Sequence, residues 1–363
     1  MTDPTVPDAT PPPKPDVDGG IRALLEAAGI KGNLDQISQI LATGVRLGQD
    51  GTDRLDLKIT NAALAEMRNA FKIFQPFNDI PKVTIFGSAR TRTDDPQYVQ
   101  AHEVAAALAD AGWMVVTGAG PGIMQAAMEG AGADRSIGVS IRLPFEARAN
   151  DLIHDDPKHV SMKYFFTRKL MLVKESRAFL SVPGGFGTLD ETFELLTLQQ
   201  TGKAEPTPIV LLDVPGGSFW QGFRRFVDEE LVTLGVVSPD DLDRVLITDS
   251  VDAAVDEIKG FWRNYDSLRW VGKRLVLRMR AEPTEAEVDA LNEQFGDLLL
   301  EGRIERSGPL SAESSGNDKL ELPRLVMVWN QFRIGSLHRL IRALNHLDSA
   351  PPVAEAPAPV ATD

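Results

Sequence analysis

The feature that most limits the fold of this chain is a regular alternation of short apolar runs and helical patterns between residues 81 and 264. Six apolar runs occur there: Val83–Phe86, Trp113–Thr117, Ile137–Ile141, Ala178–Val182, Ile209–Leu212 and Val245–Thr248. Helical patterns lie between and after them, at about 97–111, 122–132, 161–176, 189–201, 219–233 and 251–264. Strands that are apolar on both faces and alternate with helices are typical of parallel sheets. We therefore predict an α/β fold here, a doubly wound parallel sheet with helices on both faces.

The segments on either side of this alternation follow other patterns. Residues 20–80 predict a helical N-terminal region, in which Leu64, Met67 and Phe71 recur at spacings of three and four. Residues 265–348 predict a small α+β appendage, with strands at Arg274–Met279 and Leu325–Trp329, helices at Glu285–Leu300 and Ser336–Leu347, and a polar loop at 307–319. No cluster of residues in it suggests chemistry. That appendage is open to three interpretations: an oligomerisation element, a regulatory ligand site or a lid.

Both ends of the chain are rich in proline. Residues 1–20 hold six prolines and residues 349–363 hold four, of 24 in the whole chain. Such segments bury too little apolar surface to offset the entropy lost on ordering. We expect disordered tails at 1–19 and 349–363.

Charge and composition exclude several classes of protein. The formal net charge is −14, which argues against nucleic-acid binding and against an anionic membrane surface as a partner. The chain has no cysteine, so disulfides, zinc–thiolate sites, iron–sulfur clusters and cysteine nucleophiles are excluded. The five histidines lack the spacing of a zinc protease, and neither a metal nor a cofactor is expected. With no apolar signal segment and no long apolar run, we expect a cytoplasmic protein.

Three glycine-bearing turns follow expected strands, where open parallel sheets bind their ligands. The first two are Gly87-Ser88 and the stretch from Gly118 to Met124, which matches neither the G-x-G-x-x-G nor the P-loop pattern. Helix N-termini after such turns favour anions. A plain tight turn and close strand–helix packing are the alternative interpretations. The candidate binding residues are Gly87, Ser88, Gly118, Gly120, Gly122 and Met124.

The third turn, Gly184-Gly185-Phe186-Gly187-Thr188, is the richest in glycine. Three glycines allow the backbone to wrap an anion, and the Thr188 hydroxyl can add a hydrogen bond. Thr188 and Glu191 also have the spacing of a helix capping box, which is the alternative interpretation. A capping box does not explain the three glycines, so we favour phosphate binding.

A carboxylate beside a phosphate site suggests chemistry on an uncharged or cationic part of the ligand. Glu191 could stabilise the oxocarbenium character that a ribose develops as its glycosidic bond breaks, or activate the attacking water. Arg168 and Lys169, on an expected helix, could supply the cation that holds phosphate or balances Glu191. The alternative for this pair is a solvated helix face.

Together these motifs resemble the LONELY GUY (LOG) family of cytokinin riboside 5′-monophosphate phosphoribohydrolases, once widely mislabelled lysine decarboxylases. The resemblance covers about 82–261 and rests on Arg168-Lys169 with the P-G-G-x-G-T-x-x-E pattern of residues 183–191. Supporting matches are Gly118–Met124, Leu143–Glu146 and Gln199–Gly202.

The resemblance implies a Rossmann-like nucleotide-binding and catalytic domain that hydrolyses a nucleoside 5′-monophosphate to free base and ribose 5-phosphate. It makes Arg168 and Glu191 the catalytic residues, and it implies a homodimer or a higher homo-oligomer. It also implies further substrate-binding residues, namely Glu146, Lys169, Asp190 and Thr197. The chain departs from many relatives at Gly118-Ala119-Gly120 and at Met128, and its length is closer to that of the longer bacterial members, which include broad nucleotide nucleosidases.

Two other functions stay open at this point. The first is a non-hydrolytic nucleotide-binding or sensing protein of the same superfamily, which would bind nucleotide tightly without turnover. The second is pyridoxal-dependent decarboxylation, for which the sequence offers no feature of its own. The identity of the base is not specified by any motif.

Overall fold

The computed structural model describes residues 16–142, 150 and 152–353. Contacts divide the chain into two compact units, Met1–Ala65 and Glu66–Asp363. Among the described residues, no helix is both long and apolar enough to cross a membrane.

The first unit is helical, as expected. It holds α1 (Val17–Ala27), α2 (Leu34–Gln49) and the first part of α3 (Arg54–Phe74), which continues into the second unit. Helix α1 begins earlier than expected, because the Asp16 side chain accepts a hydrogen bond from Gly19 N and caps it. The expected disordered tail is thus wrong for residues 16–19, and residues 1–15 lie outside the described part.

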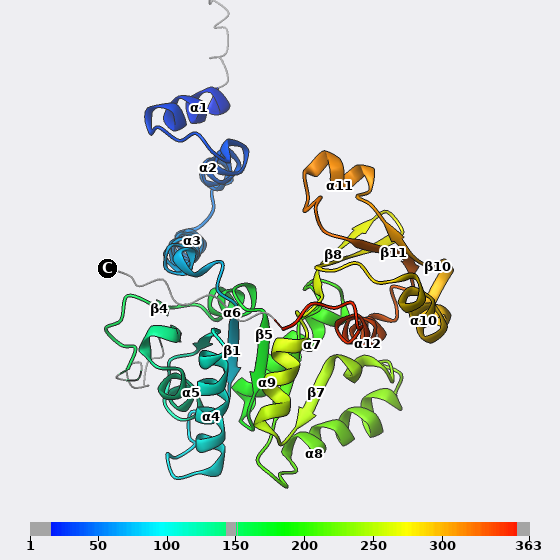
Figure 1. The fold of residues 1–363 in the computed structure, drawn as a ribbon. Helices are drawn as coiled ribbons and strands as arrows, with labels where there is room; N and C mark the ends of the chain where they lie inside the picture. The colour runs from blue at the N-terminus through cyan, green and yellow to red at the C-terminus, as the bar shows by residue number, and fades with distance from the viewer. Residues whose placement is uncertain (1–15, 143–149, 151, 354–363) are drawn as a thin grey trace, which may run out of the picture. The chain divides into compact units, whose positions relative to one another are not determined.

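The second unit contains a seven-stranded parallel sheet with the order β4-β3-β2-β1-β5-β6-β7 (Figure 1). Its strands are β1 (Lys82–Phe86), β2 (Met114–Thr117), β3 (Ser136–Ile141), β4 (His159–Met162), β5 (Ala178–Ser181), β6 (Ile209–Leu212) and β7 (Val245–Thr248). The doubly wound α/β fold is confirmed. Strand β4 was not expected from the sequence, and it displaces the start of the helix expected at 161–176 to Phe165.

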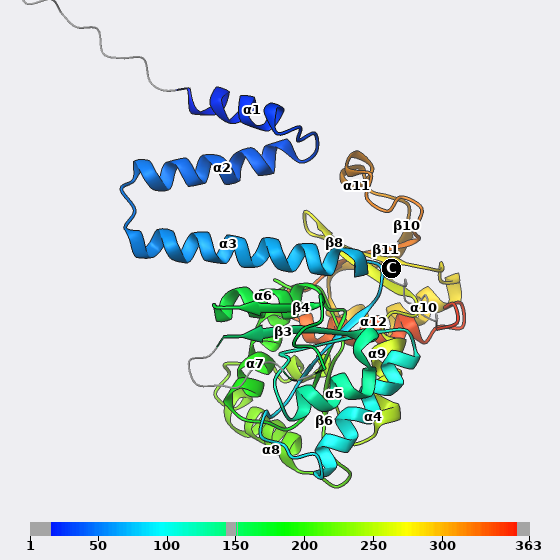
Figure 2. The same ribbon diagram turned by 90° about the vertical axis from the view of Figure 1, so that its left-hand side faces the viewer.

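Helices cover both faces of this sheet (Figure 2). They are α4 (Pro96–Asp110), α5 (Ile123–Ala131), α6 (Phe165–Lys174), α7 (Phe186–Gln200), α8 (Phe219–Phe226, continued by a π-helix at Val227–Val232) and α9 (Val251–Gly260). Successive strand residues alternate between the two cores. In β6, Ile209 and Leu211 pack with α6, α7, α8 and the end of α3, whereas Val210 and Leu212 pack with α4, α5 and α9.

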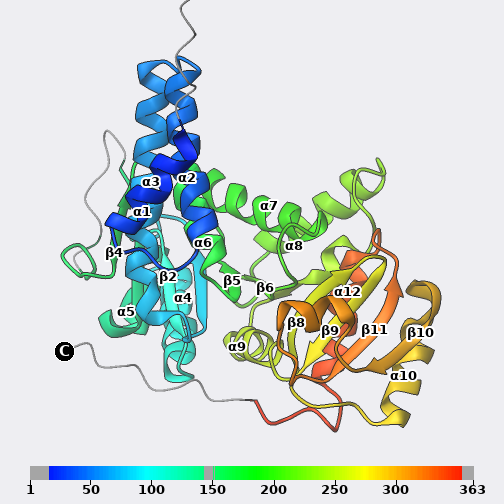
Figure 3. The same cartoon turned by 90° about the horizontal axis from the view of Figure 1, so that it is seen from above.

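A second sheet, antiparallel and four-stranded, follows in the order β10-β11-β9-β8 (Figure 3). Its elements are β8 (Tyr265–Val271), β9 (Arg274–Met279), α10 (Glu285–Phe295), β10 (Leu299–Ser307), α11 (Ser311–Gly316), β11 (Arg324–Trp329) and α12 (Ile334–Asn345). The expected α+β character is confirmed, while β8, β10 and α11 were not expected. The expected polar loop at 307–319 is wrong where α11 forms.

Helix α12 joins this sheet to the rest of the second unit. The Ser336 hydroxyl donates to Asp240 Oδ2 over 2.6 Å, and Arg342 Nε donates to Glu257 Oε1 over 2.8 Å. The backbone packs so closely that a Cβ on Gly335 would lie 1.9 Å from Asp240 O. These contacts explain why the appendage belongs to the same unit as the parallel sheet, and they favour a fixed support over a lid.

The C-terminal tail is also partly ordered. Pro351 O and Ala350 O accept hydrogen bonds from the Arg263 guanidinium, and Ser349 N donates to Glu287 Oε1. The expected disorder is therefore wrong for residues 349–351, and residues 354–363 lie outside the described part.

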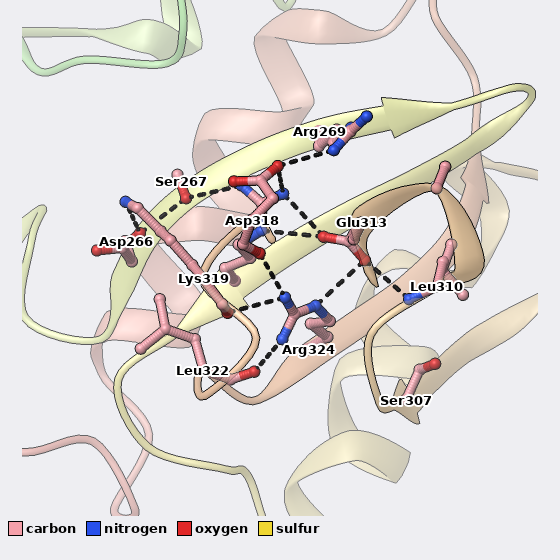
Figure 4. Close-up of polar contacts among 12 residues, drawn as sticks. Asp266, Ser267, Arg269, Ser307, Leu310, Glu313, Asp318, Lys319, Leu322 and Arg324 are labelled. Atoms are coloured by element: carbon pink, nitrogen blue, oxygen red, sulfur yellow. Dashed lines mark hydrogen bonds and ion pairs between the residues drawn. The ribbon is translucent and has the colours of Figure 1, made fainter. Parts of the chain in front are cut away.

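A buried charge network fixes α11 on the antiparallel sheet (Figure 4). Glu313, fully buried, accepts from Arg278 Nη2 at 2.8 Å and from Arg324 Nε at 3.2 Å. Asp318 accepts a second bond from Arg278, and Arg324 also donates to the carbonyl of Lys319. The sequence does not reveal the cluster because its members come from two strands, a helix and the segment after that helix. Its charges neutralise each other, which is what burial requires.

Removing Glu313 tests how much this network contributes. We expect Glu313→Ala to lower the free energy of unfolding by about 3–5 kcal/mol, because two buried guanidinium groups lose their shared acceptor. The measurement is urea unfolding followed by circular dichroism, with the exposed Asp289→Ala as control. A midpoint equal to that of the control would show that the network contributes little.

Candidate active site

The three glycine-bearing turns meet at one edge of the parallel sheet. They follow β2, β1 and β5, which are neighbours in the order β2-β1-β5. The chain proceeds from β1 through β2 and β3 to β4 and then crosses to β5 on the other side of β1, so β1 and β5 form a topological switch point. Ligands of open α/β sheets bind at such a point, beyond the carboxyl ends of the strands.

The first turn contacts both of the others through Ser88. Its carbonyl accepts a hydrogen bond from Ile123 N at 3.0 Å, at the start of α5. A Cβ on Gly122, whose φ is +67°, would lie 2.3 Å from that same carbonyl oxygen. A Cβ on Gly184 would lie 3.1 Å from Ser88 N. Glycine is thus required at residues 122 and 184 for packing, independently of any ligand.

The third turn opens directly into α7. The residue before the helix is Gly185, and the first intrahelical hydrogen bond runs from Leu189 N to Gly185 O. The N–H groups of Phe186, Gly187 and Thr188 precede that bond and lie where helices bind anions. Cβ atoms added to Gly185 or Gly187 would meet nothing within 4 Å, so these glycines face open space.

The capping-box interpretation of Thr188 and Glu191 is wrong. Thr188 is the third residue of α7 and not its cap, and no side chain caps the helix at Gly185. A side chain on Gly184 would collide with the Thr188 hydroxyl, at 2.2 Å from Oγ1. Thr188 therefore borders the backbone of its own turn.

Arg168 lies against the second turn. Its Nε donates to Val139 O of β3 over 3.0 Å, and a Cβ on Gly118 would lie 2.1 Å from its Nη2. Met124 borders the same turn, since its Cε would lie 2.6 Å from a Cβ on Gly120. Because residues 118 and 120 have no side chains, those of Arg168 and Met124 can pack against this turn.

Lys169 is engaged in ion pairs between α6 and α7. Its Nζ lies 2.7 Å from Asp190 Oδ2 and 2.9 Å from Glu194 Oε2. Although burial opposes its charge, these partners raise the pKa of Lys169 above its ordinary value. The alternative of a solvated face is wrong for Lys169, whose side chain is only 16% exposed. In this arrangement it links the two helices.

Glu191 is a buried carboxyl with unusual acidity. It is 7% exposed, and among the described residues its Oε2 has no hydrogen-bond partner. Burial raises its pKa from 4.5 to about 7, although the charges of Lys169 and Arg168 act in the opposite direction. A carboxyl that titrates near neutrality, next to a helix N-terminus and two cations, has the properties of an acid–base catalyst.

One polar residue at this edge of the sheet was not predicted from the sequence. Asn150 donates from Nδ2 to Gly120 O over 3.2 Å and from its backbone N to Ala119 O over 2.9 Å. Its buried Oδ1 has no hydrogen-bond partner among the described residues. Ala119 adopts a positive φ of 58°, which is uncommon without glycine and is held here by that backbone bond. No local sequence pattern around Asn150 predicts this contact.

One expected site residue, Thr197, lies away from the turns, and another, Glu146, lies outside the described residues. Thr197 is exposed on α7, six residues beyond Glu191 and therefore about 9 Å further along the helix axis. The other candidates, including Asp190, lie on the three turns or on the adjoining ends of α5, α6 and α7.

Comparison with known proteins supplies the family. A family model described as a possible lysine decarboxylase matches residues 122–258. A cytokinin riboside 5′-monophosphate phosphoribohydrolase of Mycobacterium tuberculosis is 34% identical over 159 residues, 43% of this chain and 81% of that protein. Its Mycobacterium marinum counterpart is 32% identical over 155 residues, 42% of this chain and 80% of that protein. The chain belongs to the LOG family.

Solved structures are more distant from this LOG-family chain. The molybdenum cofactor carrier protein of Chlamydomonas reinhardtii is 24% identical, with a TM-score of 0.34 over 50% of this chain and 96% of that one. A molybdenum cofactor binding protein from Rippkaea orientalis is 20% identical, with a TM-score of 0.36 over 50% and 96%. Neither similarity is close enough to inform function.

The acidity of Glu191 predicts an unusual effect of pH on stability. The folded state keeps this proton up to pH of about 7, whereas the unfolded chain releases it near its ordinary pKa of 4.5. The carboxylate therefore destabilises the fold increasingly as pH rises from about 4.5 to 7, and fully above that. We expect Glu191→Gln to be more stable than the unaltered protein at pH 8, by on the order of 3 kcal/mol, and to lose this advantage towards pH 5.

Thermal unfolding at pH 5, 6, 7 and 8 measures this effect. The control is Asp228→Asn on the π-helical turn after α8, whose carboxylate is half exposed. A difference between Glu191→Gln and the unaltered protein that does not change with pH would show that Glu191 titrates normally.

Proposed function

We propose that this LOG-family chain is a metal-free, cytoplasmic phosphoribohydrolase that cleaves the N-glycosidic bond of nucleoside 5′-monophosphates. The observation that carries the proposal is the buried Glu191, with its raised pKa, beside Arg168 and the N-terminus of α7. That combination supplies a proton acceptor, a cation and an anion-binding backbone within one sheet edge.

In the proposed reaction, water attacks the anomeric carbon of the ribose as the bond to the base breaks. The Glu191 carboxylate accepts the proton of that water or stabilises the oxocarbenium character of the sugar. The released base takes up a proton, and ribose 5-phosphate keeps the new hydroxyl. The N–H groups at Phe186, Gly187 and Thr188 would hold the 5′-phosphate, and Arg168 would orient the nucleotide.

Cytokinin riboside monophosphates and AMP are the proposed substrates. The mycobacterial relatives are named for the former, and both kinds of nucleotide carry a purine on ribose 5-phosphate. The length of this chain resembles that of bacterial members with broader substrates, so the preferred base is decided by assay.

Release of free base tests the reaction. We expect the protein to liberate base from at least one of AMP, GMP, CMP, UMP and isopentenyladenosine monophosphate, and to do so in the presence of EDTA. Glu191→Gln should lower kcat by about 10²- to 10⁴-fold, because it removes the proton acceptor. Chromatography of the products gives both rates and the order of substrates.

Asp228→Asn is the matched control for Glu191→Gln, and Arg224→Ala is the matched control for Arg168→Ala, which removes the guanidinium proposed to orient the nucleotide. The two controls remove the same kinds of charge from an exposed ion pair of α8 and its π-helical extension, where the atoms lie 3.6 Å apart. Tight binding of nucleotide without release of base would replace hydrolysis with the sensing function. Equal rates for Glu191→Gln and the unaltered protein would remove Glu191 from the mechanism.

We also propose that the protein acts as a homodimer through the outer faces of α6 and α7. Lys169 links these two helices, and both expose large apolar side chains. The exposed residues are Phe165, Phe166, Leu170, Phe186 and Phe193. A second copy is the partner implied by the family resemblance, and such a contact would cover aromatic rings that are otherwise hydrated.

A charge introduced on this surface tests the dimer. We expect the unaltered protein to have twice its sequence mass, or a higher multiple, in light scattering at micromolar concentration. Phe165→Glu should lower that mass towards the monomer, because a carboxylate would be buried in an apolar contact. Phe332→Glu, which alters an exposed phenylalanine just before α12, should leave it unchanged. A monomeric unaltered protein would contradict the proposal.

A further inference from the structure

Glu66 is a buried carboxylate on α3 that holds the start of α6. It is 8% exposed. Its Oε1 accepts a hydrogen bond from Lys163 N over 2.7 Å, and its Oε2 accepts one from the Thr167 hydroxyl over 2.8 Å. Lys163 precedes α6 and Thr167 is the third residue of that helix, so one carboxylate spans its first turn.

Helix α6 has no side-chain cap of its own. The residue before it is Tyr164, which makes no capping hydrogen bond. Glu66 supplies a negative charge and two acceptors from another helix, at the end of α6 where a negative charge is favourable. Without it, the buried hydroxyl of Thr167 would keep only its bond to Tyr164 O.

The next residue after Thr167 is Arg168. Its backbone N donates to Tyr164 O over 3.2 Å, so its position depends directly on the turn that Glu66 holds. Its side chain must then reach Val139 O and the space that the missing side chain of Gly118 leaves. A small rotation of the first turn of α6 would move the guanidinium away from both.

Glu66 also contacts the segment that leaves β3. Arg142 Nη2 lies 3.3 Å from Glu66 Oε1, and Arg142 N donates to Met162 O over 2.8 Å. The Arg142 side chain is 61% exposed, so its ion pair with Glu66 contributes little energy. The two hydrogen bonds from Lys163 and Thr167 carry the contact.

We infer that Glu66 is a positioning residue, which sets the guanidinium of Arg168 for the nucleotide by fixing the first turn of α6. The inference rests on the proposed function, because it gives Arg168 its role there. The role of Glu66 is specific to α6 because its hydrogen-bond partners, Lys163 and Thr167, lie on either side of the start of that helix. Neither the short apolar runs nor the glycine turns contain Glu66, and its partners lie about a hundred positions along the chain.

Two substitutions of Glu66 differ in the hydrogen bonds that they keep. Glu66→Gln keeps an acceptor for Lys163 N, and its amide can donate to the Thr167 hydroxyl, which keeps its own bond to Tyr164 O. Glu66→Ala removes both bonds. We expect Glu66→Gln to retain kcat within about twofold, whereas Glu66→Ala lowers it between about tenfold and about a hundredfold at a temperature where both are folded.

The decisive experiment is a double-mutant cycle with Arg168→Ala, followed by base release from AMP and by thermal unfolding. If Glu66 acts through Arg168, Glu66→Ala should lower kcat strongly in the unaltered protein and by less than twofold in Arg168→Ala. Equal losses of kcat in both backgrounds, or an unchanged kcat in Glu66→Ala, would overturn the inference. So would a Glu66→Gln variant as slow as Glu66→Ala.

Glu313→Ala is the control for a merely structural effect. It removes another buried, hydrogen-bonded glutamate from the second unit, and it should lower the unfolding temperature without lowering kcat. If the unaltered protein releases no base, the proposed hydrolysis fails by itself. The same double-mutant cycle is then followed through the dissociation constant of AMP. Glu66→Ala should raise this constant only while Arg168 is present. An equal increase in both backgrounds, or no increase, would overturn the positioning role.

Discussion

The place of β1 between β2 and β5 is the constraint on which the candidate site depends. Because the chain changes direction there, the turn after β1 must pack against the turns on both sides. Ser88 meets Ile123 on one side and the position of Gly184 on the other. Close packing and ligand binding, which compete as explanations in the sequence, therefore act together. Gly122 and Gly184 allow the backbones to approach, whereas Gly185 and Gly187 leave space open.

The electrostatics of the site depend on which carboxylates pair with Lys169. Lys169 pairs with Asp190 and Glu194, which lie four residues apart on α7. Glu191 lies between them in sequence but on the buried side of the helix. Burial therefore raises its pKa, and the charges of Lys169 and Arg168 offset this only in part. The arrangement destabilises the carboxylate form of Glu191, which the proposed hydrolysis needs as its proton acceptor. Such a conflict between stability and chemistry is common at active sites.

The sequence predicted the parts of the structure whose signal is local. Six strands of the parallel sheet and the glycine turns were found because each is a short run with a distinct composition. Strand β4 was missed because His159–Met162 is not an apolar run, and β10 because Ile304 is its one buried residue. Glu66, Asn150 and the Glu313 network were missed because each depends on contacts between segments far apart in the chain. No composition or spacing encodes such contacts.

The attachment of α3 also determines where the unit that holds the candidate site starts. Ala70, Phe74, Phe77 and Ile80 belong to the same apolar core as the parallel sheet, and the buried Lys82 donates to Phe77 O and Ile80 O. A fragment cut at Pro81, where the alternating pattern begins, would expose that core and leave a buried ammonium without its acceptors. The smallest piece able to fold as the second unit therefore includes the C-terminal half of α3, so that half is part of the architecture that carries the candidate site and not a detachable extension.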